Sequence, residues 1–104
     1  MIRQFDIFAN PSARSRPIAP FVSVIQSHLY DEGLTLLVTP LLSMPAEAVV
    51  TKVSVPVWFD NRPYVLMLSE MAAVDRRMAG AVQGSLASHE DDIRRALDRL
   101  FTGF

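Results

Sequence analysis

Apolar and polar residues alternate along much of this chain at the period of a β-strand. Between Lys52 and Phe59 every second residue is apolar, and residues 4–7 alternate in the same way around Phe5 and Ile7. Further short apolar segments occupy residues 21–29, 34–39 and 64–69. The pattern predicts five short strands, and the strands at 52–59 and 64–69 form a hairpin across a turn at residues 60–62.

Prolines and glycines set the limits of these strands. Because proline lacks a backbone N–H, Pro40 predicts the end of the 34–39 strand, and Pro56 places the 52–59 strand at a sheet edge or a bulge. Residues 10–20 hold three of the seven prolines without any period, which predicts a loop. Residues 41–51 suit a loop or one helical turn. Residues 71–84 stay ambiguous, because their apolar start favours a helix that two glycines weaken.

The end of the chain changes to the period of an α-helix. Its apolar residues recur three and four positions apart and form one stripe, made of Ile93, Ala96, Leu97, Leu100 and Phe101. Ser88 is the predicted N-cap, with acids at 90–92 in the first turn and arginines toward the end. Short strands before one helix of about 14 residues predict a β-rich α+β domain. Its antiparallel strands form a partly open barrel or a curled sheet capped by the helix.

Length and composition limit the classes of protein. A chain of 104 residues, half of them apolar and 20% charged, predicts one globular domain spanning residues 1–104. Its net charge of -1 gives no bulk attraction to nucleic acid or to an anionic membrane. The absence of cysteine excludes disulfides, thiolate metal sites and cysteine nucleophiles. No apolar run has the length of a signal peptide or a membrane span, so a cytoplasmic protein is expected.

The sequence offers no catalytic or metal-binding constellation. Its two histidines, His28 and His89, lie far apart and form no helical pair of ligands. No nucleophile elbow, phosphate loop or dinucleotide motif occurs. The acidic run at 90–92 is interpreted as a solvated helix start, since successive helical residues point about 100° apart. We therefore expect no catalytic residue, no metal and no cofactor.

Two features are compatible with either a structural or a binding role. Nine of the ten basic residues are arginines, which suits recognition of an anion or RNA. The candidates are Arg14, Arg16 and Arg62, with Arg76 and Arg77 as a second group. The acids nearly balance them, so a surface role is favoured. Trp58, on the polar side of its strand, is either covered by a neighbouring element or part of a protein interface.

The chain ends in Thr102, Gly103 and Phe104, directly after the predicted helix. A glycine at this place predicts a helix C-cap, and the next residue usually packs back on the last turn. Here the usual contacts for Phe104 are Arg99 and Asp98, which are both charged. The Phe104 side chain therefore packs on another copy of the chain, buries against Leu100 or is displayed to a partner protein.

Short patches spread over nearly the whole chain match a known pattern in order, spacing and total length. They are Phe21-Val22, Gln26-Ser27, Val38, Pro40, Leu41, Glu70-Met71-Ala72, Val74, Asp92-Ile93, Ala96, Leu100 and Gly103 before a terminal apolar residue. In these residues the chain resembles the CcdB family, the toxin half of bacterial toxin–antitoxin pairs that poison DNA gyrase. The resemblance implies a homodimer of small SH3-like barrels, each with a C-terminal helix and no catalytic centre.

The resemblance also implies partners and contact residues. The helix tips bind the A subunit of DNA gyrase through Thr102, Gly103 and Phe104, and trap the enzyme on cleaved DNA. Thr102 stands where the best-known form of the motif has tryptophan, and we hypothesise that Phe104 supplies part of that lost aromatic contact. A CcdA-like antitoxin wraps the toxin and pulls it off gyrase, with Phe8, Arg14, Arg16 and Glu47 as candidate contacts. The dimer interface is assigned to Ile93, Leu97, Leu100 and Phe101.

The same resemblance implies that toxin and antitoxin together repress their own promoter, so that DNA is reached only indirectly, through the antitoxin or gyrase. Two alternatives stay open. One is a ribonuclease toxin of the MazF or Kid type, which cuts messenger RNA in a basic groove; the net charge and the lack of a convincing arginine, acid and histidine set weigh against it. The other is an inactive dimeric binding module, an alternative that Thr102 keeps open.

Overall fold

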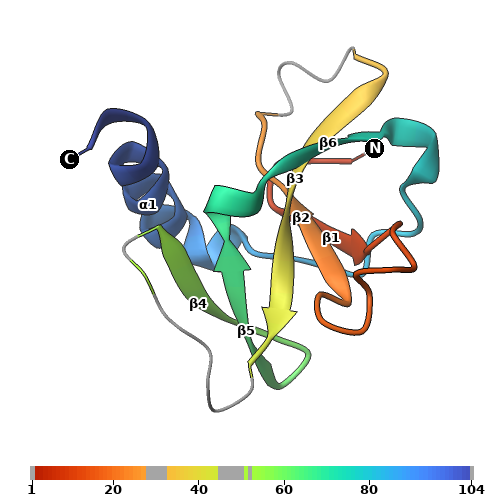
Figure 1. Cartoon of the computed structure of the whole chain (residues 1–104), viewed down its shortest axis with the longest axis horizontal. Helices are drawn as coiled ribbons and strands as arrows, with labels where there is room; N and C mark the ends of the chain where they lie inside the picture. Colours follow the sequence, from red (N-terminus) through yellow and green to blue (C-terminus); the bar gives the residue numbers. More distant parts are fainter. Residues whose placement is uncertain (1, 28–32, 45–50, 52, 104) are drawn as a thin grey trace.

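The computed structural model of the chain describes residues 2–27, 33–44, 51 and 53–103 (Figure 1). Seven strands lie within these residues: β1 (Asp6–Ala9), β2 (Phe21–Val24), β3 (Thr35–Ser43), β4 (Ser54–Phe59), β5 (Arg62–Met67), β6 (Ala72–Asp75) and β7 (Gly84–Ser85). Three short 3-10 helices follow the later strands: η2 (Leu68–Glu70), η3 (Arg76–Met78) and η4 (Ala87–His89). The α-helix α1 (Glu90–Thr102) comes last.

The strands form one antiparallel sheet in the order β4-β5-β3-β2-β1-β7. The long strand β3 organises this sheet, because it pairs with β2 along one edge and with both β6 and β5 along the other. Figure 1 shows β6 crossing over the upper part of β3, while α1 packs beside β4 and β5. The predicted class is confirmed, with antiparallel strands in a partly open, curled arrangement and one C-terminal helix.

Successive side chains of the central strands point to opposite faces of the sheet and contribute to two separate hydrophobic cores, one on each face. On β3, for example, Leu41 faces one core while Leu36 and Val38 face the other. We call the first the helix-side core; its buried members are Phe5, Ile7, Ile25, Leu41, Val55, Val57, Tyr64, Leu66, Leu68, Leu86, Ile93 and Ala96. The second, the loop-side core, consists of Phe8, Val22, Val24, Leu36 and Val38. Strands that are apolar on both faces are buried on both faces.

The hairpin of β4 and β5 agrees with its sequence signals. Its two turn residues, Asp60 and Asn61, both have positive φ, at 54° and 60°, as a tight type I′ turn requires. Pro56 lies on β4, which is the edge strand that its missing N–H predicted. The outward N–H groups of Ser54 and Trp58 donate to the Thr51 carbonyl at 3.3 Å and to Nε2 of His89 at 3.4 Å. Positions 54, 56 and 58 of this edge therefore have no free N–H to offer to a further strand.

The predicted end of a strand at Pro40 is wrong, because β3 continues to Ser43. Hydrogen-bonded and non-bonded pairs alternate in an antiparallel ladder, and the Ile25 N–H to Leu37 carbonyl bond of 2.9 Å fixes their order. The backbone nitrogen of Pro40 therefore faces away from β2. It points into the gap where β3 changes its partner from β6 to β5, so no hydrogen bond of the β2–β3 ladder is lost. In that gap the Met67 carbonyl accepts a hydrogen bond from the Thr39 hydroxyl at 2.6 Å. This carbonyl therefore has a donor although Pro40 cannot supply one.

The first strand begins later than predicted. A turn forms at residues 3–6, where the Arg3 N–H donates to the Asp6 carboxylate at 2.7 Å and the Asp6 N–H to the Arg3 carbonyl at 3.1 Å. Phe5 takes a positive φ of 70° inside this turn, and β1 starts at Asp6. Phe5 and Ile7 nevertheless share one face, as predicted, and both lie in the helix-side core.

Three other boundaries also differ from the prediction. The strand expected at 21–29 ends at Val24 as β2, and residues 28–32 lie outside the described residues. The ambiguous segment 71–84 forms the strand β6, the short 3-10 helix η3 and the start of β7, and contains no α-helix. Ser88 is not the N-cap of α1, because the 3-10 turn η4 precedes the helix and makes His89 the capping position, without a side-chain hydrogen bond.

Candidate protein-binding sites

The helix α1 buries a narrow stripe and exposes its end. Ile93 and Ala96 are fully buried against the sheet, and the small alanine side chain lets the helix approach closely. Two ion pairs follow its surface, Arg94 to Glu90 at 2.9 Å and Arg95 to Asp92 at 3.3 Å. Near the last turn the stripe becomes open, and the Phe101 side chain has an exposed fraction of 69%. A large exposed aromatic side chain at a helix end is a candidate contact for a partner protein.

The C-terminal tip ends in a defined cap. Gly103 has φ 80°, the left-handed conformation that glycine adopts without a Cβ clash, and its N–H donates to the Arg99 carbonyl at 3.1 Å. This confirms the predicted glycine cap. The Thr102 hydroxyl donates to the Asp98 carbonyl at 2.6 Å and is satisfied within its own helix. Figure 1 shows this tip at the outer edge of the molecule, and Phe104 lies outside the described residues.

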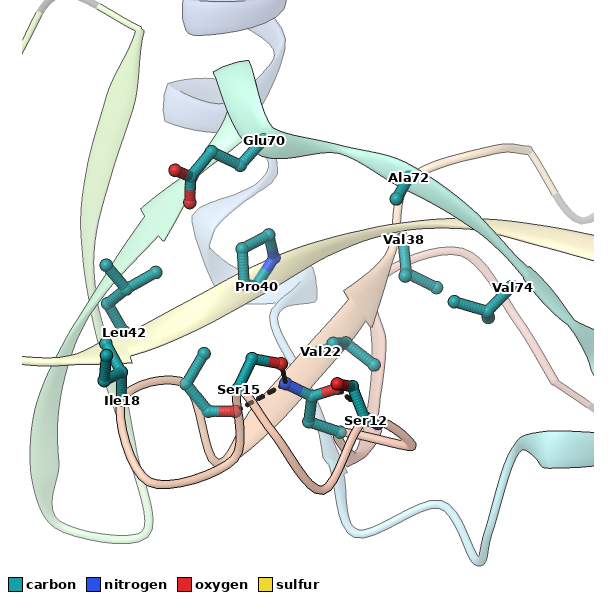
Figure 2. A pocket seen from close by; sticks show the side chains of 12 residues that line it. Ser12, Ser15, Ile18, Val22, Val38, Pro40, Leu42, Glu70, Ala72 and Val74 are labelled. Carbon is teal, nitrogen blue, oxygen red and sulfur yellow. Dashed lines mark hydrogen bonds between the residues drawn. The ribbon is translucent and has the colours of Figure 1, made fainter.

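An apolar groove lies over the loop-side core. It has a volume of about 460 Å³ and is lined by Asn10, Ser12, Ser15, Ile18, Ala19, Val22, Val38, Pro40, Leu42, Glu70, Ala72 and Val74. Figure 2 shows Pro40 and Val22 on its floor, the loop at residues 10–20 along one wall, and β6 together with Glu70 at the end of η2 along the other. The groove is thus built from three segments that are distant in the sequence.

A buried asparagine holds the loop wall in place. The Asn10 amide nitrogen donates to the Ser15 hydroxyl at 2.9 Å and to the Ala19 carbonyl at 2.8 Å. The Asn10 side-chain oxygen accepts the Ser12 N–H at 3.0 Å, and the Arg16 Nε donates to the Asn10 carbonyl at 2.8 Å. Because the loop folds around these bonds, the wall is shaped before any partner arrives.

The candidate antitoxin contacts fall into different environments. Phe8 has an exposed fraction of 0% and lies in the loop-side core. Its side chain cannot contact a partner on the surface, so Phe8 is no longer a candidate antitoxin contact. Arg14 and Arg16 are exposed on the loop beside the groove. Glu47 lies outside the described residues. The two arginines are therefore exposed, although Arg16 also donates to the Asn10 carbonyl within its own loop, and Phe8 packs in the core.

The candidate dimer residues are also divided. Ile93 is fully buried within its own chain and is removed from the contact set for the same reason. Leu97 and Leu100 are partly buried at the border of the helix-side core, and Phe101 is exposed. These three residues share the open end of the stripe. Trp58, whose exposed fraction is 65%, is not covered by a neighbouring element of its own chain.

Several of the remaining basic and titratable residues are held by hydrogen bonds or ion pairs within the described part of the chain. The Arg76 Nε donates to the Gly33 carbonyl at 2.9 Å, and Arg77 pairs with Asp75 at 2.7 Å. The side-chain hydrogen bond from Arg77, with a second bond from its backbone N–H, lowers the pKa of Asp75 below its usual 3.8. Arg62 lies at the start of β5, and His28 lies outside the described residues.

The part of the chain that the structure describes lacks a cluster of metal ligands. Within it, no three side chains of histidine, aspartate or glutamate gather in a way that could hold a metal ion. No helix in this same part has both the length and the apolar character needed to cross a bilayer.

The groove was missed by the reasoning from sequence. A signal was present, because β2 and β3 are apolar on both faces while the sequence contains only one evident amphipathic helix to cover them. A second apolar face without a second helix must be covered by loops or left partly open. Which of the two occurs depends on the path of residues 10–20, and that path follows from the hydrogen bonds of Asn10.

Comparison with known proteins gives one family. The sequence profile of the CcdB protein family matches residues 4–103, nearly the whole chain. No curated protein matches the chain with significance. The match spans every described strand of the sheet and the full length of α1 up to its glycine cap. The chain therefore belongs to the CcdB family.

Proposed function

We propose that this chain is the toxin of a toxin–antitoxin pair, which binds the A subunit of DNA gyrase and traps the enzyme on cleaved DNA. The observation that carries the proposal is the family match over residues 4–103, because the CcdB family implies a toxin that acts on gyrase. Such a protein works by occupying another enzyme and makes or breaks no bond itself.

The exposed tip of α1 supports this assignment. Thr102, Gly103 and Phe104 are the proposed gyrase contact. The hydroxyl of Thr102 is already satisfied by the Asp98 carbonyl, so Thr102 offers mainly its methyl group. An aromatic side chain contributes far more buried area at an interface than a methyl group. Because Phe101 is assigned to the proposed dimer interface, aromatic contact with gyrase is proposed for Phe104, which is the hypothesis drawn from the sequence.

Dimerisation is proposed through Leu97, Leu100 and Phe101, the open end of the apolar stripe. These side chains are the part of the stripe that their own chain leaves partly or largely exposed. A second copy would bring two tips together, and a symmetric pair is the commonest assembly of soluble proteins. A CcdA-like antitoxin is the proposed neutralising partner, with Arg14, Arg16 and Glu47 as contacts, and the pair together represses its own promoter.

The test is an assay of supercoiled plasmid with purified gyrase and ATP. Wild-type chain should convert plasmid to the linear form trapped by gyrase, and Phe104→Ala should weaken this inhibition while the protein keeps its oligomeric state. Trp58→Ala is the matched control, because Trp58 is a large exposed aromatic residue outside the proposed gyrase contact. Equal inhibition by wild type and Phe104→Ala would contradict the role of Phe104. Cleavage of RNA without gyrase, or no effect on plasmid at all, would contradict the proposed function.

A further inference from the structure

We propose that His89 is a pH-sensitive link between the start of α1 and the edge strand β4: its neutral imidazole accepts a hydrogen bond from the Trp58 N–H, and protonation of the ring breaks that bond. The bond joins Nε2 of His89 to the backbone nitrogen of Trp58 at 3.4 Å. The two residues are 31 positions apart in the sequence, so the bond connects two elements that no local turn joins. The inference goes beyond the proposed function and does not rest on it.

The backbone at His89 is fixed by bonds that do not involve the ring. The His89 N–H donates to the Leu86 carbonyl at 2.9 Å within the turn η4, and the Leu86 N–H donates to the Phe5 carbonyl at 2.9 Å. Leu86 itself is fully buried in the helix-side core. The imidazole is therefore attached to an anchored part of the fold, and its protonation acts first on the side-chain bond to Trp58.

Only the neutral ring can accept this bond. When the proton of a neutral histidine is on Nδ1, Nε2 has a lone pair to offer, whereas both ring nitrogens of the protonated form are donors. Protonation of His89 would place two N–H donors opposite one another, so the Trp58 N–H loses its acceptor. Histidine is the side chain that ordinarily changes its charge between about pH 5 and about pH 8. The link is thus present at the upper end of this range and is lost toward the lower end.

The edge of β4 makes the loss consequential. Of the outward positions 54, 56 and 58, only position 58 depends on an acceptor that can be protonated in this range. The Ser54 N–H is bonded to the Thr51 backbone carbonyl, and Pro56 has no N–H at any pH. A protonated His89 therefore leaves one unpaired N–H on an exposed edge strand, and such groups are the ones through which edge strands pair with further strands.

The charged groups near His89 favour a second position for the protonated ring. No other ionisable side chain occurs on β4 or η4. The ionisable groups of the adjoining elements are Glu90, Asp91 and Asp92 in the first turn of α1, Asp60 and Arg62 at the hairpin turn, and Arg3 and Asp6, which border the same hollow as Glu90. Glu90 and Asp92 are also paired with arginines of α1, at 2.9 Å and 3.3 Å. The acids of the first turn attract a protonated imidazole, so protonation draws the ring from the Trp58 N–H toward a carboxylate.

The experiment follows the Trp58 amide hydrogen of the full-length chain by NMR between about pH 8 and about pH 5.5, the range in which histidine titrates. Its exchange with water, corrected for the intrinsic pH dependence of amide exchange, measures its protection. In wild type the protection should fall by about fivefold on acidification, with the same midpoint as the ring signals of His89. Trp58 is the only tryptophan of the chain, so the indole fluorescence should change with that midpoint as well.

Three variants isolate the contribution of the ring. His89→Gln supplies a carboxamide oxygen that accepts a hydrogen bond at every pH, so protection of the Trp58 amide should no longer depend on pH. His89→Phe has no acceptor, so protection should be low throughout the range. His28→Gln removes the only other histidine and is the matched control, which should keep the wild-type response. Urea unfolding at about pH 8 checks that each variant is folded.

The proposal is overturned if protection of the Trp58 amide in wild type is the same at both ends of the range. It is also overturned if the change persists in His89→Gln or in His89→Phe, because the ring would then not be its cause. A change that disappears in His28→Gln would contradict it for the same reason. Gyrase inhibition by the wild-type chain tests the proposed function separately, since none of these outcomes depends on gyrase.

Discussion

The two faces of the sheet are covered in different ways, and the difference divides the molecule into a closed side and a partly open side. The helix-side core is closed by α1, whose residues Ile93 and Ala96 are fully buried. The loop-side core is covered by residues 10–20 and by β6, which cannot pack as a continuous layer and leave a groove of about 460 Å³. Apolar surface that a helix would have sealed is thus left in contact with solvent.

The covers also differ in how they are held. The helix is held by its apolar stripe, so its position depends on the core beneath it. The loop is held by the polar bonds of Asn10 and by the Ser43 N–H to Ile18 carbonyl bond, so its position depends little on the apolar surface that it borders. A loop held in this way can leave apolar side chains such as Ile18 in contact with solvent. Substitutions on the two sides should therefore have different consequences.

The largest effect is expected from truncation in the helix-side core. Ile93→Ala should lower the free energy of unfolding by about 2–5 kcal/mol, because the helix cannot collapse fully into the cavity that is left. Leu36→Ala, in the loop-side core, removes the same number of carbon atoms from a side chain that is 1% exposed. It should cost less, since the loop-side core is smaller, with five buried residues against twelve in the helix-side core. Urea unfolding measures both, and an equal or larger loss at Leu36 would contradict the comparison.

The next effect concerns the close approach of β7 to the hairpin. A Cβ atom placed on Gly84 would lie 2.5 Å from a ring carbon of Phe59. Phe59 is itself held edge-on to Phe21 at 5.1 Å and cannot easily give way. Gly84→Ala should therefore destabilise the fold by about 1–3 kcal/mol through overpacking.

Gly80→Ala is the matched control for this substitution. A Cβ atom at Gly80 meets nothing within 4 Å, so the change should be neutral or slightly stabilising in thermal unfolding. A similar loss for both variants would show that the Phe59 ring does not decide the response at Gly84.

The helix-side cover was the more predictable of the two. The stripe from Ile93 to Phe101, the Asp60-Asn61 turn and the edge position of Pro56 each depend on neighbours in the sequence, and the structure confirms all three. The predictions were wrong where the local structure depends on segments that are distant in the sequence or on the approach to an element. Pro40 continues a strand because β3 changes partners at that point, and Ser88 loses the N-cap because η4 extends the approach to the helix.

The candidate binding residues show the same limit. Sequence position alone placed Phe8 beside exposed arginines in a contact set, although alternation on β1 directs its side chain into the loop-side core. The groove was not predicted, since Ile18, Val38 and Ala72 come together only through the pairing of β3 with β2 and β6. The Gly103 cap could be predicted, because a glycine after a helical stripe is a local signal.

A smaller effect is expected at that cap. Gly103 has φ 80° and a Cβ atom there would meet nothing within 4 Å, so a substitution acts only through the backbone conformation. Gly103→Ala should cost about 1 kcal/mol and fray the last turn of α1, while Gly103→Asn should cost less because asparagine tolerates this conformation. Amide exchange at the end of the helix measures the fraying. Equal protection in Gly103→Ala and wild type would contradict the requirement for glycine.

The smallest effect is expected at the exposed Asp75–Arg77 pair, on the loop side at the end of β6. The Arg77 side chain holds the pKa of Asp75 below its usual 3.8, so Arg77→Gln should raise that pKa part of the way back, with the backbone N–H bond from residue 77 retained. Because the folded pKa is lowered, the stabilisation is present above the pKa of the unfolded chain and is lost as pH falls through the folded value. The stability difference between wild type and Arg77→Gln should therefore shrink toward zero as pH falls through the folded pKa of Asp75, and it should also shrink in high salt. An NMR titration of the Asp75 carboxyl group and acid unfolding with and without salt measure both. A difference that persists unchanged at low pH would mean that Arg77 stabilises β6 through packing of its side chain and not through its charge.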